Sequence, residues 1–234
     1  MTGLSIKNLS RITGATYLLM VPFGVLGILY VANAIFVVGD IVATIDNINA
    51  NISMVHLSVF ASLMVQLIQI LLVLLLYRLF NHVNKTAAIL MVAFIIPAVS
   101  IAMLNEVFLL TVVELVSNAS YPTSFTVLQI QGLVQLLFGT YQAGVMIAQI
   151  FWGLWLFPMG YLVYKSGYVP RIIGVLLMVG CFGYLIDSLL FILAIDVGFT
   201  VSEFTFLCEI LLPLWLLFRA SDVSKKYLAR TTPA

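Results

Sequence analysis

The sequence predicts an all-α integral membrane protein: a bundle of six transmembrane helices with both termini in the cytoplasm. Hydrophobic residues make up 63% of its 234 residues and charged residues only 8%, which is too little charge for the surface of a soluble domain. The apolar residues form six long runs, and the basic residues gather at alternate ends of those runs. Together these observations give both the fold class and the orientation of the helices.

Each apolar run is long enough to cross a hydrocarbon core of about 30 Å as a helix. A membrane β-barrel would instead show alternating segments of about ten residues, which are not visible here. The first run is too long for a signal peptide and lacks a clear cleavage site, so we read it as a retained span. The predicted spans are 12–38, 54–80, 87–116, 139–164, 170–195 and 199–219, within a domain of residues 1–220, followed by a loose, polar, basic cytoplasmic tail, 221–234.

The positions of Lys and Arg predict the orientation. Three connections, 39–53, 117–138 and 196–198, contain neither residue. Basic connections stay in the cytoplasm, so both termini are placed there and the number of spans must be even. The basic residues are Lys7, Arg11, Arg78, Lys85, Lys165, Arg171, Arg219, Lys225, Lys226 and Arg230.

Local patterns refine this picture at two connections and on one helix face. The first outer connection, GDIVATIDNINANIS, is expected to begin with a short interfacial helix. Glutamines at helical spacing continue one face of the fourth span upstream, so that helix is predicted to begin near Ser124. Below Gln149 the same face carries Gly153 and Gly160, where another helix can approach closely. The glutamines are Gln131, Gln135, Gln142 and Gln149.

Polar residues inside the spans are the candidate functional residues, because ionisable groups are costly in a bilayer. Four helices each carry one polar strip, and such strips must face inward because lipid offers no hydrogen bonds. We therefore predict a polar cavity that opens to the outside and has its floor near Glu209, Gln66 and Gln69. The predicted ligand-binding residues are Glu209, Asp187, Gln66, Gln69, Gln142, Gln149, Glu106 and Asn105.

Three functions fit this pattern. The first is a non-enzymatic protein, transport-like or sensory, whose pocket holds a small or lipidic ligand. The second is a structural subunit that binds a partner protein in the membrane, with its polar residues joining helices. The third is an intramembrane enzyme that uses Glu209 and Asp187 as acid and base. We favour a non-enzymatic role.

Several functions are disfavoured by what the sequence lacks. It has no Walker loop, nucleophile elbow or dinucleotide fingerprint. His56 and His82 fall at opposite ends of one predicted span, so they cannot share a metal or haem. A net charge of +1 argues against a nucleic-acid partner. We predict no catalytic residue, metal or cofactor, and expect membrane lipids as partners.

Several segments resemble a known family. They include GYLVYKSGYVPRIIGVLL, GYLIDS and EILLPLWLLFRA, which begin at Gly160, Gly183 and Glu209. Over essentially the whole chain, the sequence is similar to the bacterial multi-pass membrane family known as domain of unknown function 4386. The resemblance implies one helical domain in the inner membrane of a bacterium or archaeon, with no established activity. It also implies that Glu209 and Asp187 match acidic positions that are common in the family.

The chain also differs from that family's usual pattern. Members commonly carry acidic residues where this chain has Ser62 and Gln69, and a histidine where it has Trp155. The resemblance therefore implies a binding or structural role more than a shared catalytic one.

Overall fold

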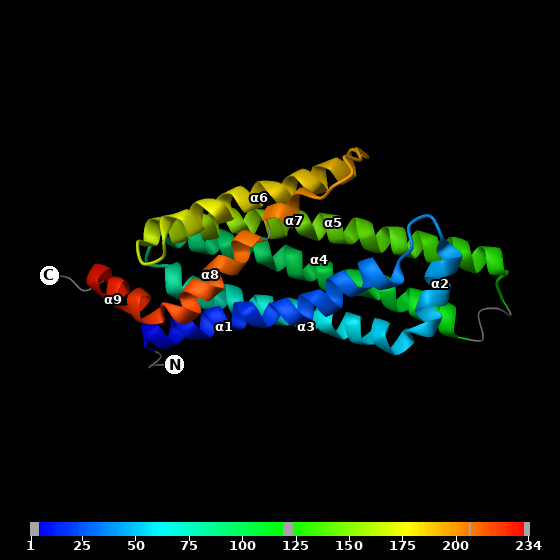
Figure 1. Ribbon diagram of the computed structural model, residues 1–234, viewed down its shortest axis with the longest axis horizontal. Helices are drawn as coiled ribbons and strands as arrows, with labels where there is room; N and C mark the ends of the chain where they lie inside the picture. The colour runs from blue at the N-terminus through cyan, green and yellow to red at the C-terminus, as the bar shows by residue number, and fades with distance from the viewer. Residues whose placement is uncertain (1–4, 119–123, 206, 232–234) are drawn as a thin grey trace. The chain divides into compact units, whose positions relative to one another are not determined.

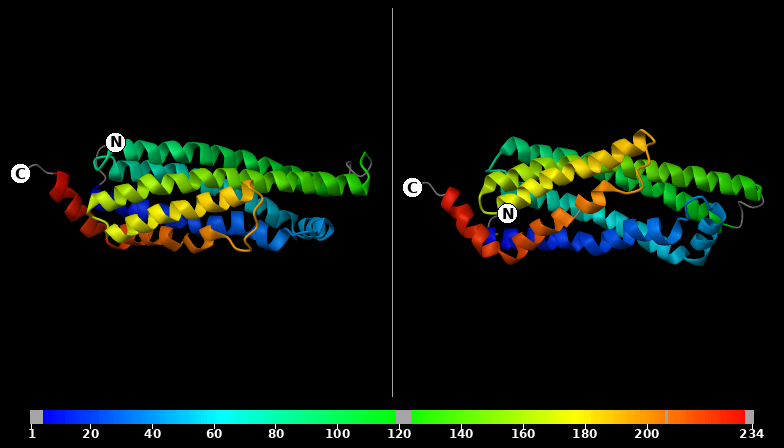
Figure 2. Two further views of the ribbon diagram at one scale, coloured as in Figure 1. Left: turned by 90° about the horizontal axis from the view of Figure 1, so that it is seen from above. Right: turned by 45° about the horizontal axis from the view of Figure 1, so that its top comes forward.

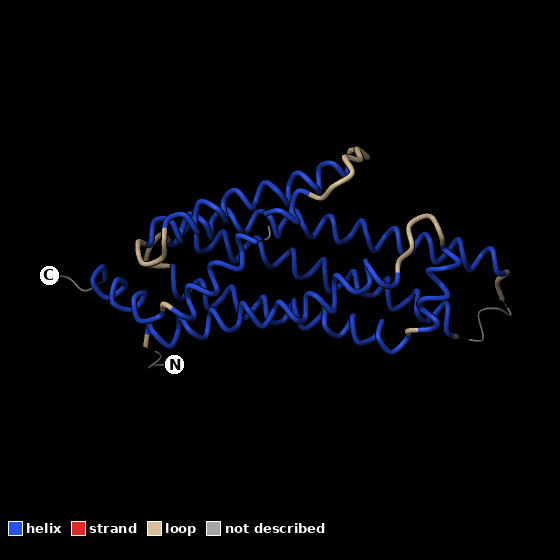
Figure 3. Tube along the Cα trace, in the orientation of Figure 1, coloured by secondary structure: helices blue, strands red, loops and turns tan. Residues whose placement is uncertain are grey.

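The computed structural model describes residues 5–118, 124–205 and 207–231, and these residues form helices joined by short loops, with no strand among them (Figures 1 and 3). The prediction of an all-α protein is confirmed. The elements are α1 (Ile6–Gly24), the π-helical segments η1 (Val25–Leu29) and η2 (Val31–Ile35), α2 (Ile41–Ala50), α3 (Ile52–Phe80), α4 (Lys85–Ser117), α5 (Val127–Ser166), α6 (Arg171–Ile192), α7 (Val201–Thr205), α8 (Leu207–Phe218) and α9 (Ala220–Thr231).

Five helical stretches among the described residues are long and apolar enough to cross a membrane. Each overlaps one of the first five predicted spans. The fourth, α5, begins at Val127 and has 40 residues, so the prediction of one long helix that starts near Ser124 is confirmed. The short helix predicted in the first outer connection is also present, as α2, with the Asp40 side chain accepting a hydrogen bond from the Ala43 N–H. The five stretches are Ile6–Ile35, Ile52–Phe80, Lys85–Ser117, Val127–Ser166 and Arg171–Ile192.

The sixth predicted span, 199–219, corresponds to shorter helices. The chain turns back after α6, and α7 and α8 then run beside α6 in the opposite direction (Figure 2). The apolar helical stretch here, Glu209–Phe218, is shorter than the five others. Residue 206, between α7 and α8, lies outside the described residues.

The chain divides into two compact units, and each contains parts of the long helices. Unit 1 comprises residues 1–19, 68–99 and 146–234, and unit 2 comprises residues 20–67 and 100–145. The units are described separately below.

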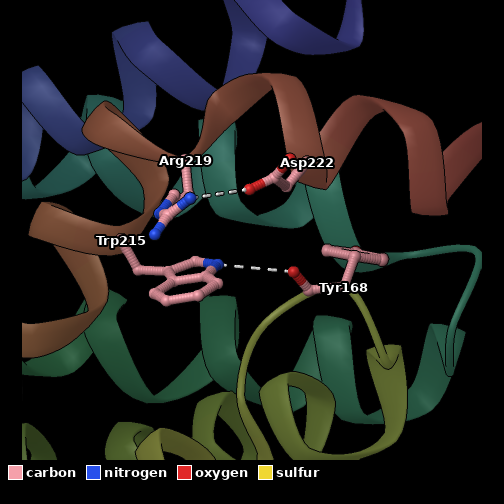
Figure 4. A network of polar contacts seen from close by, with 4 residues as sticks. All are labelled: Tyr168, Trp215, Arg219 and Asp222. Atoms are coloured by element: carbon pink, nitrogen blue, oxygen red, sulfur yellow. Dashed lines mark hydrogen bonds and ion pairs between the residues drawn. The ribbon is translucent and has the colours of Figure 1, made fainter.

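The basic segments of the chain meet at one end of unit 1. The Ser10 hydroxyl, at the start of α1, donates to the Leu216 carbonyl near the end of α8 (2.7 Å). The Tyr168 hydroxyl, in the turn between α5 and α6, donates to the Leu79 carbonyl at the end of α3 (2.8 Å). The Trp215 indole N–H of α8 donates to the Tyr168 carbonyl (3.4 Å; Figure 4). Four segments that each carry Lys or Arg therefore share one end of this unit.

The segment after residue 220 forms a helix, so the prediction of a loose tail is wrong for the described part of it. Val223 of α9 is fully buried, and the Tyr227 ring packs edge-on against His82 with ring centres 4.4 Å apart. An ion pair of 3.4 Å between Arg219 and Asp222 joins the end of α8 to α9 (Figure 4). Burial of Val223 and packing of the half-buried Tyr227 against His82 supply the contacts that order a segment of this length, which is marginal as an isolated helix.

Close packing of α5 against α6 is a second feature of unit 1. A Cβ atom added to Gly160 would lie 2.5 Å from the Gly174 carbonyl oxygen, and one added to Gly174 would lie 2.6 Å from the Gly160 carbonyl oxygen. A Cβ atom added to Gly153 would lie 2.9 Å from Cβ of Tyr184 and 3.0 Å from the Cys181 carbonyl oxygen. The small-residue face predicted from the sequence is thus confirmed as a helix contact, because only glycine lets the two backbones approach this far.

Unit 2 has an apolar core in which short elements fill the space beside longer helices. Ile48 of α2 and Val55 of α3 are completely buried, together with Ile35 at the end of η2. The Phe36 ring stacks on Phe138 of α5, with ring centres 4.4 Å apart and planes 8° from parallel. Gly27 of η1 lies against the Ser62 backbone, where an added Cβ would be 2.5 Å from the Ser62 nitrogen. η1 therefore closes one side of the site described next.

Candidate functional site

Unit 2 contains a buried polar site on α3 and α4. The Ser62 hydroxyl donates a hydrogen bond of 2.5 Å to Oε1 of Glu106, and the two residues are 3% and 4% exposed. One helical turn after Ser62, on the same face of α3, lies Gln66, which is 1% exposed. Asn105 precedes Glu106 and is 3% exposed. We call Ser62, Gln66, Asn105 and Glu106 the Glu106 site.

Hydrogen bonding in the Glu106 site is incomplete. Oε2 of Glu106 has no hydrogen-bond partner, and neither does the amide oxygen or the amide nitrogen of Gln66. These are the buried side-chain atoms without a partner among the described residues. Buried polar atoms are normally hydrogen-bonded, so three such atoms on two neighbouring helices need an explanation.

The Asn105 side chain, by contrast, has a hydrogen-bond partner. Its side-chain amide donates to the Tyr141 carbonyl of α5 (2.8 Å), which ties α4 to α5. Its Oδ1 atom occupies the space above Gly144, where an added Cβ would lie 1.9 Å away. Asn105 therefore has a structural contact at the edge of the Glu106 site.

Unit 1 contains a second polar cluster, around Glu209 of α8. The Tyr17 hydroxyl of α1 donates to Oε2 of Glu209 (3.0 Å), and the Tyr184 hydroxyl of α6 donates to Oε1 (2.6 Å). The Tyr17 ring packs against Trp155, with ring centres 6.2 Å apart. Both carboxyl oxygens have a donor, so Glu209 joins three helices through satisfied hydrogen bonds. We call Tyr17, Tyr184 and Glu209 the Glu209 cluster.

Asp187 holds the start of α7. Its Oδ1 atom accepts the Val201 N–H (2.7 Å), and its Oδ2 atom accepts the Ser202 N–H (2.8 Å). Amides at the start of a helix have no partner within the helix, and a carboxylate is a good acceptor for them. Asp187 is 7% exposed, so this cap is largely shielded from the surroundings.

The predicted glutamines have different surroundings. Gln69 is buried and accepts a hydrogen bond from the Trp152 indole (3.2 Å). Gln149 is buried and donates a long hydrogen bond of 3.4 Å to the Tyr184 carbonyl. Gln142 is exposed, so the structure does not place it among the buried polar groups. The polar strip of α3 is buried along its whole length, as predicted; it consists of Ser58, Ser62, Gln66 and Gln69.

Sequence reasoning missed the aromatic residues that complete these arrangements. Trp155 is 2% exposed and packs on Tyr17. Tyr17 and Tyr141 are also buried. Tyr184 is the exception: it lies one turn before Asp187 and Ser188 on α6, so the sequence places it on the same helix face as Asp187. No sequence signal connects Tyr17 to Glu209, which is 192 residues away.

No group of three or more His, Cys, Asp and Glu side chains within the described ranges could hold a metal ion. The side chains of the Glu106 site carry carboxyl, amide and hydroxyl groups, and those of the Glu209 cluster carry a carboxyl and two phenol groups.

Replacing Tyr17 by Phe should destabilise the protein by about 1–2 kcal/mol, because one oxygen of the Glu209 carboxyl loses its donor in largely apolar surroundings. The apparent melting temperature of the purified protein in detergent measures the effect. Tyr164→Phe, at a tyrosine of α5 for which the described structure shows no hydroxyl hydrogen bond, is the control and should change stability little. Equal stability of Tyr17→Phe and wild type would show that the Tyr17–Glu209 bond does not hold the helices together.

Comparison with known proteins gives a family but no activity. An 81-residue segment is 38% identical to an uncharacterised protein of Archaeoglobus fulgidus, covering 34% of this chain and 48% of that protein. The chain thus matches about half the length of this curated relative. No solved structure matches the chain. The sequence model of the family described as "Domain of unknown function (DUF4386)" matches residues 12–220. The chain therefore belongs to the DUF4386 family.

Proposed function

We propose that this multi-pass membrane protein binds a small polar molecule at the Glu106 site and acts as a transport-like or sensory component, not as an enzyme. The observation that carries the proposal is the set of three buried polar atoms without partners on Gln66 and Glu106. A buried polar group left unsatisfied costs about 1–3 kcal/mol. A bound molecule that completes these hydrogen bonds offsets that cost.

The unpaired atoms define the chemistry of the ligand. Oε2 of Glu106 and the amide oxygen of Gln66 need donors, and the Gln66 amide nitrogen needs an acceptor. A compact molecule with an amine or hydroxyl group next to a carbonyl or similar acceptor meets all three needs. η1 closes one side of the site, where Gly27 lies against the Ser62 backbone, and this favours a small ligand over a long lipid chain.

The carboxylates suggested for catalysis have other partners. Both oxygens of Glu209 accept phenol hydrogen bonds, and both oxygens of Asp187 accept backbone amides. Every carboxyl oxygen of Glu209 and Asp187 therefore has a donor. In the Glu106 site, by contrast, Oε2 of Glu106 has none. This supports a non-enzymatic role in which Glu209 and Asp187 hold helices together.

The proposed membrane topology has six crossings, with both termini on the cytoplasmic side of the inner membrane. In support, the basic segments at the start of α1, in the α3–α4 and α5–α6 turns and at the end of α8 meet at one end of unit 1, as the positive-inside rule requires for cytoplasmic segments. Residues 201–218 contain no Lys or Arg and would span about 27 Å as a helix. Glu106 lies 21 residues after Lys85, about 31 Å along α4, toward the outer side.

The decisive variant is Gln66→Leu. If Gln66 serves a ligand, the ligand-free protein gains about 1 kcal/mol or more in stability, because two unpaired polar atoms are replaced by an apolar side chain. The variant should also lose any stabilisation by ligand. The measurement is the melting temperature in detergent, with and without a panel of amino acids, polyols and small amides. A ligand at 100 times its Kd stabilises wild type by about 2.7 kcal/mol.

Gln69→Leu, one turn further along α3, is the matched control. Gln69 accepts a hydrogen bond from Trp152, so its loss should destabilise the protein without affecting stabilisation by a ligand. If Gln66→Leu is instead as destabilising as Gln69→Leu, and no compound stabilises the wild type, the Glu106 site joins helices. The structural or partner-binding alternative is then the better description.

A further inference from the structure

A separate cavity lies in unit 1, where the chain turns from α6 to α7. It has a volume of about 470 Å³, within the range of small-molecule sites. Seven of its ten lining residues are apolar, and Leu190, Phe191, Ile195 and Phe199 are among them. Phe191 and Phe199 are 46% and 60% exposed, so the apolar wall is open to molecules from the surroundings.

The polar side of this cavity is acidic. Asp187 and Asp196 both line it, and no lining residue is basic. Between Arg171 and Arg219 the chain has four carboxylates and no Lys, Arg or His. Backbone amides donate to Asp187 from Val201 and Ser202, and the Gly198 amide donates to Asp196 (2.8 Å). These neutral donors orient the carboxylates but do not cancel their charge.

We propose that this cavity binds an amphipathic molecule with net positive charge, such as an alkylammonium compound. The apolar wall takes the hydrocarbon part. The ammonium group lies near Asp187 and Asp196, where the Coulomb attraction is strongest. The aromatic faces of Phe191 and Phe199 add a favourable interaction with a cation. A zwitterionic lipid headgroup is a poorer occupant, because its phosphate faces the two carboxylates.

This inference involves none of the residues of the Glu106 site, so either proposal can fail alone. The test uses the whole protein in phosphatidylcholine nanodiscs and measures binding of dodecyltrimethylammonium by equilibrium dialysis, with empty nanodiscs as the blank. Dodecylphosphocholine, which has the same chain and a zwitterionic headgroup, is the comparison ligand. We expect saturable binding of the cation above the blank and at least tenfold weaker binding of the zwitterion.

Asp196→Asn tests the acidic side of the cavity. Asparagine keeps an oxygen for the Gly198 amide and removes the charge, so the fold should be retained, and binding of the cation should weaken about 5- to 10-fold. Phe199→Leu keeps the apolar wall and removes the ring, and should weaken binding about 2- to 5-fold. Glu114→Gln, at an exposed carboxylate of α4 in unit 2, should bind like wild type.

The proposal is overturned if the cation binds no more to protein-containing nanodiscs than to empty ones. It is also overturned if the zwitterion binds equally well, or if Asp196→Asn and Phe199→Leu both bind the cation like Glu114→Gln while each variant elutes as a monodisperse, helical protein.

Discussion

Replacing Gly160 by Ala is expected to lower the free energy of unfolding by about 1–3 kcal/mol, the usual cost of forcing an extra group into a packed interface. The added Cβ would lie 2.5 Å from the Gly174 carbonyl oxygen and 2.8 Å from the Met178 nitrogen. Both are backbone atoms of α6, so neither can move away without shifting the helix. Chemical or thermal unfolding in detergent measures the loss.

The same substitution at Gly139 provides the control within the same helix. Gly139 of α5 has no atom within 4 Å of an added Cβ, so Gly139→Ala should be neutral or should stabilise α5 by up to about 1 kcal/mol. If the change in the free energy of unfolding has opposite signs in the two variants, the α5–α6 contact is the cause of the loss in Gly160→Ala. If Gly160→Ala is as stable as Gly139→Ala, the two helices are not packed this closely.

Replacing Asp187 by Ala should cost about 2–4 kcal/mol, because it leaves the Val201 and Ser202 amides without acceptors in a largely buried place. Stability should fall both at the start of α7 and in the protein as a whole, because the Asp187 cap joins α6 to the start of α7. Hydrogen exchange at those two amides is expected to accelerate in Asp187→Ala, and the melting temperature should fall.

Two further variants distinguish the loss of the Asp187 cap from a general effect of removing a negative charge. Asp187→Asn keeps one acceptor oxygen and should lose about half as much stability. Asp40→Ala removes the exposed cap of α2 and should cost only about 1 kcal/mol. If hydrogen exchange at the Val201 and Ser202 amides is unchanged in Asp187→Ala, Asp187 does not cap α7. The prediction that Asp187 binds a ligand is then favoured.

The sequence was sufficient to predict the helices and several of their contacts. The apolar runs predicted the ends of the first five long helices to within a few residues, except at the start of α1 and of α5. They could do so because a membrane-crossing helix must be continuous and apolar over about 20 residues. The glutamine spacing predicted the early start of α5, and the glycine spacing predicted a close contact with another helix, which the structure identifies as α6. These features depend on local periodicity, which a sequence displays directly. The helix at 220–231 was missed because its order comes from packing of Val223 and Tyr227.

Only the tertiary structure distinguished the three carboxyl groups of the apolar runs from one another. In the sequence, Glu106, Asp187 and Glu209 are three costly residues in apolar surroundings, and the two suggested as acid and base were Glu209 and Asp187, not Glu106. Their roles depend on donors that come from distant parts of the chain: Tyr17 for Glu209, the α7 amides for Asp187, and a single serine for Glu106. A hydrogen bond forms or fails over a few tenths of an ångström, so a pattern of residue types predicts which groups are polar but not which of them lack a partner.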